Sequence, residues 1–168
     1  IQYLPLGSQL CVKKIEDNWA KISLSDKNEQ KFAYVPVNHI IGIREKHKDW
    51  VNIAESLLDT PYKWGGRDTM GLDCSALLQL SYQTYGENIP RNTSDQIKCN
   101  KTLVSNINKI NRGSVVFWKG HVGIMIDKLN CLHANAFHMK TTIESLKNVN
   151  DRIGKESKIL KIMNFNNE

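Results

Sequence analysis

Gly71-Leu72-Asp73-Cys74-Ser75, preceded by Pro61-Tyr62-Lys63-Trp64-Gly65-Gly66, is the stretch that decides the fold of this chain. Its glycines predict a loop, because glycine adopts backbone conformations that other residues rarely take. The loop ends at Asp73, a favoured N-cap residue, and an amphipathic run follows it. The pattern predicts a helix with Cys74 in its first turn, where the positive end of the helix dipole should lower the pKa of a thiol.

Hydrophobic periodicity divides the chain into two parts. Residues 9–15, 19–24 and 32–37 alternate apolar and polar side chains, which predicts the strands of a small β-barrel at 1–45. The part at 46–168 starts with helical periodicity: a helix from Trp50 to Pro61, the helix after Asp73 and a short one at 93–96. Residues 114–118, 121–127, 131–137, 138–143 and 157–165 then predict strands. The fold class is α+β, with helices followed by a meandering antiparallel sheet.

Three residues have the chemistry of a cysteine hydrolase, which needs a thiolate, an imidazole that shuttles the proton and a third polar group that orients this imidazole. Cys74 is the candidate nucleophile. His121 opens a predicted strand directly after the two-residue turn Lys119-Gly120, and His133 lies on the next strand. A hairpin would bring the two imidazoles together, so that His133 fixes the tautomer of His121.

The remaining histidines give weaker patterns. His39 and His47 are interpreted as ordinary surface or core residues. Cys131, His133 and His138 form an alternative constellation that could bind a metal from consecutive strands. Zinc sites have closer, recognisable ligand spacing and a fourth ligand. We therefore expect neither a metal nor an organic cofactor.

Composition narrows the range of partners. The net charge of the 168 residues is +6, but the lysines are scattered rather than gathered with aromatic residues, so no nucleic-acid partner is predicted. No apolar run is long enough for a membrane span. The four cysteines are too few for a disulfide framework in a chain of this length. We expect a monomer, and the start at Ile1 predicts a processed or truncated product.

The order of five stretches resembles the NlpC-type cell-wall cysteine peptidases, which are papain-like enzymes. These stretches are residues 61–66, 71–75, 90–94, 113–118 and 121–124, and the resemblance spans residues 50–140. Residues 1–45 resemble the bacterial Src-homology-3-like barrel that often precedes this domain, through Asp17-Asn18-Trp19 and Ala33-Tyr34-Val35. The resemblance therefore implies a barrel at 1–45 and a papain-like peptidase domain at 46–168.

The resemblance also implies a reaction. It makes Cys74 the nucleophile, His121 the general base and His133 the third polar residue. The implied target is the amide bond between γ-D-glutamate and a diamino acid, either meso-diaminopimelate or lysine, in peptidoglycan stem peptides. Short fragments with a free N-terminal L-Ala are the implied substrates, with the barrel limiting access to the cleft. The compartment stays open between the bacterial cytoplasm and the cell envelope.

Five residues form the implied substrate-binding set. Asp73 and Ser75 match residues that hold the free amino-terminal end of L-Ala-γ-D-Glu peptides in barrel-fused relatives. Tyr62 matches a tyrosine beside the catalytic thiol, where a phenol would stabilise the developing oxyanion. Trp64 and Asn92 complete the set.

The chain departs from the family pattern at two positions. Ala76 stands where glycine is usual, and Asn92 stands where aspartate is frequent, keeping a helix-capping role but losing a charge. Two other functions therefore stay open. One is a papain-like amidase or acyltransferase, which His133 disfavours because such relatives carry Asn, Glu or Asp as the third residue. The other is a catalytically idle module that binds wall peptides.

Overall fold

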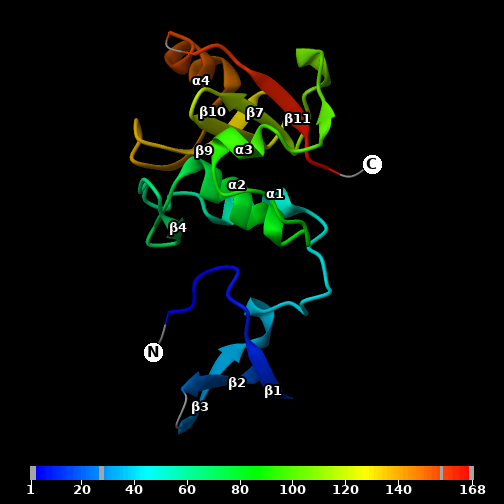
Figure 1. The fold of residues 1–168 in the computed structure, drawn as a ribbon, viewed down its shortest axis with the longest axis vertical. Helices are drawn as coiled ribbons and strands as arrows, with labels where there is room; N and C mark the ends of the chain where they lie inside the picture. The colour runs from blue at the N-terminus through cyan, green and yellow to red at the C-terminus, as the bar shows by residue number, and fades with distance from the viewer. Residues whose placement is uncertain (1–2, 27–28, 156, 167–168) are drawn as a thin grey trace. The chain divides into compact units, whose positions relative to one another are not determined.

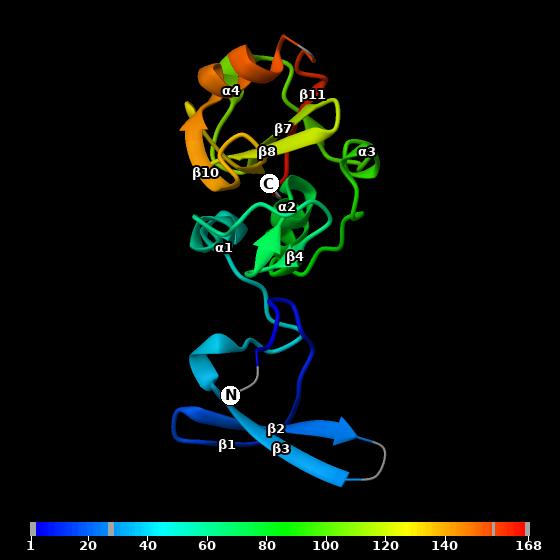
Figure 2. The ribbon, with the colours of Figure 1, turned by 90° about the vertical axis from the view of Figure 1, so that its left-hand side faces the viewer.

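The computed structural model describes residues 3–26, 29–155 and 157–166. The chain divides into two compact units, Ile1–Lys46 and His47–Glu168 (Figures 1 and 2). Within the described ranges, every helix is too short or too polar to cross a membrane.

The first unit contains a three-stranded antiparallel sheet in the order β1-β2-β3. Its strands are β1 (Cys11–Glu16), β2 (Trp19–Asp26) and β3 (Glu29–Pro36), followed by the 3-10 helix η1 (Val37–His39). Asp17 takes the left-handed conformation, with φ of 52°, in the tight turn between β1 and β2. The three strands lie within a few residues of those predicted, but closure into a barrel is not confirmed.

The second unit is built on a six-stranded antiparallel sheet in the order β10-β9-β8-β7-β11-β6. Strands β7 to β10 form the predicted meander, and β11 returns to pair with β7 and β6. Trp118 pairs with His121 across the predicted turn, where Gly120 has φ of 73°. The bounds are β6 (Thr102–Leu103), β7 (Ser114–Trp118), β8 (His121–Met125), β9 (Asn130–Asn135), β10 (Lys140–Ser145) and β11 (Lys161–Asn164).

Helices cover both faces of this sheet (Figures 1 and 2). The helices of the second unit are α1 (Trp50–Ser56), α2 (Cys74–Gln83), α3 (Thr93–Gln96), η2 (Ile107–Lys109) and α4 (Leu146–Ile153). Helix α2 packs on α1 and on strands β8 and β9, while α4 packs on β9 and β10 from the other face. The loop between α1 and α2 carries a short hairpin of β4 (Arg67–Asp68) and β5 (Gly71–Leu72).

Helix α2 is buried around most of its circumference. The sequence predicts one apolar face that includes Tyr85, with a stop at Gly86. The structure ends the helix at Gln83 and buries Tyr82 instead, whose ring meets that of Trp50 edge-on at 5.3 Å. The single-face prediction is wrong because α2 lies between α1 and the sheet, so two sides of the helix face apolar neighbours.

A second apolar layer fills the space between the sheet and α4. Its members share near-complete burial: Ile110, Val116, Trp118, Met125, Cys131, Leu146 and Val149. Periodicity analysis did not predict α4, and the strand predicted at 157–165 is the shorter β11. Ser145 caps α4 by accepting a hydrogen bond from the backbone of Asn148.

Candidate active site

Cys74 is the first residue of α2, as the sequence predicts. Asp73 is the N-cap, and its Oδ1 accepts a hydrogen bond of 2.8 Å from the backbone N–H of Ala76. The Cys74 side chain is 8% exposed. The backbone N–H of Val122 and the hydroxyl of Thr93 both act to lower the pKa of this thiol, so both groups lie beside the sulfur. The sulfur of Cys74 on α2 therefore lies beside Val122 of β8, the residue that follows His121.

The thiol nevertheless holds its proton in the free protein. Burial raises the pKa of Cys74, the charge of Asp73 adds to this effect, and the groups around the sulfur only partly offset it. The expected net lowering of this pKa at the helix start does not occur in the free protein, because desolvation of the thiolate outweighs the hydrogen bonds from Val122, Thr93 and Ser75. A neighbouring base must therefore remove the proton.

The meander brings His121 and His133 together. Nε2 of His121 lies 2.8 Å from Nδ1 of His133, and the ring centroids are 5.1 Å apart at 74°. His133 is fully buried, while the half-buried His121 ring packs against Trp118 at 5.8 Å. Burial, together with the charges on His133 and Arg152, lowers the pKa of His121 to about 3. His121 is thus neutral at pH 7, and its Nδ1 is the ring nitrogen that His133 leaves available.

Two further charged residues stand behind His133, and sequence reasoning missed both. Nε2 of His133 lies 2.9 Å from Oε1 of Glu144 on β10. Arg152 of α4 donates to both carboxylate oxygens of Glu144, with Nη1 2.8 Å from Oε2. Burial opposes ionisation of Glu144, but the hydrogen bonds from Arg152 and His133 outweigh it and lower the pKa to about 2. The predicted strand ends at residue 143, one residue short of Glu144, and α4 was not predicted.

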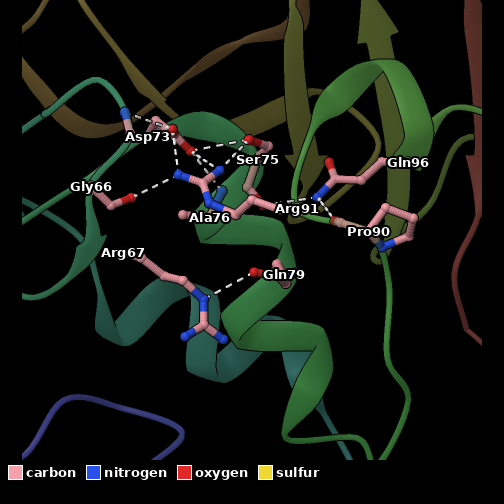
Figure 3. Close-up of polar contacts among 10 residues, drawn as sticks. Gly66, Arg67, Asp73, Ser75, Ala76, Gln79, Pro90, Arg91 and Gln96 are labelled. Atoms are coloured by element: carbon pink, nitrogen blue, oxygen red, sulfur yellow. Dashed lines mark hydrogen bonds and ion pairs between the residues drawn. The ribbon is translucent and has the colours of Figure 1, made fainter.

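The start of α2 is tied to the glycine-rich loop by Arg91, which the sequence analysis did not single out (Figure 3). Nη1 of Arg91 donates to Oδ1 of Asp73 and to Oγ of Ser75, both at 2.8 Å. Nη2 donates to Oδ2 of Asp73 at 2.7 Å and to the carbonyl of Gly66 at 3.2 Å. Burial opposes ionisation of Asp73, but Arg91 and the backbone N–H of Ala76 hold its pKa below the usual value.

Tyr62 lies close enough to Cys74 for an ionised thiolate to oppose ionisation of its phenol. Burial raises the pKa of its phenol, and the charges of Cys74 and Asp73 raise it further, so the hydroxyl keeps its proton. The backbone N–H of Tyr62 donates to the carbonyl of Met139 at 2.9 Å, which fixes this end of the loop to the turn after β9. Trp64 on the same loop is 85% exposed.

Asn92 takes the N-cap position of α3, but its exposed side chain makes no capping hydrogen bond. The predicted capping role of Asn92 is wrong, and the short helix is instead anchored by hydrogen bonds to residues outside it. The buried amide of Gln96 donates to the carbonyls of Ser75 and Pro90, both at 2.9 Å (Figure 3). Helix α3 is therefore anchored to the first turn of α2 by Gln96.

The three residues of the alternative metal constellation are not arranged as metal ligands in the described part of the chain. Cys131 is fully buried, and burial raises its pKa to about 12. Nε2 of His138 lies 3.1 Å from Oε1 of Glu144, which His133 also contacts. Among the residues described, no group of three or more His, Cys, Asp or Glu side chains is arranged to hold a metal ion. All four cysteines are free.

A cysteine at the start of a central helix that packs on an antiparallel sheet, with a histidine on the adjacent strand and a second polar residue behind that histidine, defines a papain-like cysteine peptidase. Residues 59–152, more than half of the chain, match the NlpC/P60 family. The chain belongs to the NlpC/P60 family.

Curated relatives match a similar region. The chain is 31% identical over 129 residues to a gamma-D-glutamyl-L-lysine dipeptidyl-peptidase of Bacillus subtilis, covering 71% of this chain and 42% of the relative. It is 30% identical over 102 residues to a probable endopeptidase NlpC homolog of Haemophilus influenzae, covering 59% and 54%. It is 29% identical over 96 residues to dipeptidyl-peptidase 6 of Lysinibacillus sphaericus, covering 57% and 35%. The chain thus spans from 35% to 54% of the length of these relatives.

Solved structures confirm the papain-like α+β fold. An NlpC/P60 family protein of Bacillus cereus superposes with a TM-score of 0.77 at 21% identity, over 94% of this chain and 54% of that one. The NlpC/p60 domain of the peptidoglycan hydrolase SagA superposes with a TM-score of 0.57 at 25% identity, over 69% and 96%.

Proposed function

We propose that this chain is a cysteine peptidase that hydrolyses the amide bond between γ-D-glutamate and the diamino acid of peptidoglycan stem peptides. The observation that carries the proposal is the His121–His133 hydrogen bond of 2.8 Å, because Val122, the residue after His121, places its backbone N–H beside the thiol at the start of α2. Membership of the NlpC/P60 family and similarity to a peptidase named for a γ-D-glutamyl-L-lysine bond support the choice of substrate. The proposal includes a barrel at 1–45 and a peptidase domain at 46–168.

The proposed reaction uses three residues. His121 takes the proton of Cys74 through Nδ1, since His133 occupies its Nε2. The thiolate attacks the γ-carbonyl carbon, and the tetrahedral intermediate collapses as His121 gives its proton to the leaving amine of the diamino acid. A thioester of Cys74 remains. Water, deprotonated by His121, then attacks this thioester, and the γ-glutamyl carboxylate leaves as the thiol is regenerated.

The developing oxyanion requires donors near the sulfur. The first backbone N–H groups of α2 point along the helix axis at this position, and Cys74 supplies one of them. The phenol of Tyr62 supplies a second donor, because its raised pKa keeps it protonated beside the thiol. Removing one such donor in other hydrolases costs about 10²–10³ in kcat, and we expect a loss of this order for Tyr62→Phe.

The proposed substrate contacts lie around the same loop. Ser75 and Asp73 would hold the free amino end of L-Ala, while Trp64 and Asn92 are exposed and available to the peptide. Because Arg91 already pairs with Asp73, an incoming ammonium group shares that carboxylate. We therefore expect the free amino end to contribute less affinity than an unshared ion pair would provide.

Product analysis tests the proposal. The protein is incubated with L-Ala-γ-D-Glu-meso-diaminopimelate or L-Ala-γ-D-Glu-L-Lys, and the products are separated and weighed by mass spectrometry. The expected products are the dipeptide L-Ala-D-Glu and the free diamino acid, with no turnover by Cys74→Ala. Release of ammonia alone, or transfer of the acyl group to an added amine, would instead establish the amidase or acyltransferase alternative.

Thiol labelling separates a live enzyme from an idle binding module. Cys11 is exposed and Cys99 is half-buried, so the measurement uses a Cys11→Ser, Cys99→Ser variant in which Cys74 and Cys131 remain. Alkylation of one thiol, identified as Cys74 by peptide mapping, should abolish turnover, and substrate should slow the labelling. An idle module would bind the peptide without releasing product, before and after alkylation.

A further inference from the structure

A line of four polar groups from four elements runs away from the thiol. His121 on β8 contacts His133 on β9, His133 contacts Glu144 on β10, and Arg152 on α4 holds Glu144. The His133 side chain is fully buried, and that of Glu144 is 12% exposed. The strand register explains this line: Glu144 pairs with Cys131, two residues before His133, so both side chains lie on the face of the sheet that α4 covers.

The chemistry of the far end fixes the direction of every hydrogen bond in this line. An ionised carboxylate only accepts, so Nε2 of His133 must carry the proton that it donates to Glu144. In a neutral imidazole the other nitrogen then lacks a proton, and Nδ1 of His133 accepts from Nε2 of His121. His121 in turn has a bare Nδ1. This is the tautomer that a general base for the thiol requires.

We propose that Glu144, clamped by Arg152, is a positioning residue that sets the tautomer of both imidazoles. The proposal rests on the proposed function, because it takes His121 to be the base for Cys74. Glu144 touches neither the substrate nor the reacting atoms and acts through His133. Its clamp is rigid, because a guanidinium fork engages both carboxylate oxygens and lies over the ring of Phe137, 4.4 Å from the centroid.

Asn135 shows why a carboxylate is needed at this position. Its Nδ2 lies 3.3 Å from Nε2 of His133, and an amide N–H would donate to that nitrogen if it carried no proton. Such a donation would reverse the whole line and leave His121 with a proton on Nδ1. The ionised Glu144 prevents this reversal. Besides Glu144, the charged groups that act on the His133 ring are Arg152 from α4 and His138 from the turn after β9.

Glu144→Gln removes the charge with little change of shape. We expect kcat on the stem tripeptide to fall by about 100-fold with KM nearly unchanged, since the substrate site is untouched. Glu55→Gln is the matched control: Glu55 also pairs with an arginine, Arg112, at 2.6 Å, but this pair contacts no histidine of the site. The control should keep the kcat of the wild-type enzyme.

Nitrogen-15 spectra of the histidine rings provide a readout that a purely structural role would not change. In the wild-type protein at pH 7, His121 and His133 should both show a protonated Nε2 and a bare Nδ1. In Glu144→Gln, a fraction of both rings should show the reverse. A proton on Nδ1 of either wild-type ring, or a variant with wild-type kcat, would overturn the proposal. Expected tautomers in a protein that cleaves no stem peptide would instead reject the proposed function and retain the role of Glu144.

Discussion

Arg91 shows how one guanidinium organises the residues around the nucleophile. It donates to Asp73, Ser75 and the carbonyl of Gly66, so it links the N-cap of α2, the residue after Cys74 and the glycine-rich loop. The Asp73 side chain is 13% exposed. Without Arg91, burial of this carboxylate would no longer be offset by a countercharge. Arg91 therefore helps to position the thiol through Asp73 and Ser75, the residues on either side of Cys74.

Arg91→Ala should lower the free energy of unfolding by about 1–3 kcal/mol, because it leaves a largely buried carboxylate without its countercharge. In a chain of this size the midpoint of thermal unfolding should fall by about 2–4 °C for each kcal/mol. Urea unfolding and a thermal scan measure both quantities. Arg91→Lys should recover only part of the loss, because one ammonium cannot serve two carboxylate oxygens, a hydroxyl and a carbonyl at once.

Arg67→Ala is the control for this prediction. Arg67 is exposed on the neighbouring β4 and donates to the side chain of Gln79 at 3.0 Å (Figure 3). It also donates to the side chain of Gln83 at 3.2 Å. Its removal breaks two exposed hydrogen bonds and leaves no buried charge. Equal unfolding midpoints for the Arg91 and Arg67 variants would show that the buried contacts of Arg91 add no more to stability than the exposed contacts of Arg67.

Strands β8 and β9 meet so closely at Gly123 that any side chain there would force a neighbouring atom to move. A Cβ atom added there would lie 2.3 Å from Sγ of Cys131 and 3.7 Å from Cβ of His133. Gly123→Ala should therefore destabilise the protein by about 1–3 kcal/mol through overpacking. Because the same shift moves His133, kcat should fall as well. Combining it with Cys131→Ala should recover stability, since the second change removes the atom that clashes.

A double-mutant cycle from urea unfolding measures this coupling. Gly120→Ala serves as the control, because Gly120 has φ of 73° and no atom lies within 4 Å of an added Cβ. Its cost is conformational, so Cys131→Ala should not relieve it. Strictly additive effects of Gly123→Ala and Cys131→Ala would contradict the proposed clash.

Local patterns in the sequence predicted most elements, and the exceptions have physical causes. Features set by residues close together in the sequence could be predicted. They include the N-cap at Asp73, the turn at Lys119-Gly120 and the meander of consecutive strands. Helix α4 carried a readable signal that was missed: a Ser145 cap with Leu146 and Val149 three residues apart on one face.

The groups that complete the candidate site could not be found in this way. Glu144 approaches His133 only through the pairing of β10 with β9, and Arg152 approaches Glu144 only through the packing of α4. The raised pKa of Cys74 likewise follows from burial, which depends on the whole fold and not on the helix start alone.

At the scale of the whole molecule, the buried site makes stability depend on pH. The unfolded chain titrates its histidines near 6.5, whereas burial lowers the pKa of His121 to about 3 and also lowers that of His133. Between these values the unfolded state binds more protons than the folded state, so stability falls as the pH falls. Glu144 acts in the same direction at lower pH, from its ordinary 4.5 to about 2 in the folded protein, because its hydrogen bonds require the ionised form.

The free energy of unfolding should therefore be highest above pH 6.5 and decrease continuously from pH 6.5 towards pH 3, as the unfolded chain takes up protons that the buried histidines exclude. Urea midpoints at several pH values measure this slope. His121→Gln should reduce this slope between pH 6.5 and pH 5.5, because it removes one of the two buried imidazoles and Glu144 is still ionised in both states over this interval. His47→Gln changes an exposed histidine and should keep the wild-type slope. If all three proteins lost stability in parallel over this interval, the acid sensitivity would come from the general charge of the chain and not from the buried imidazoles.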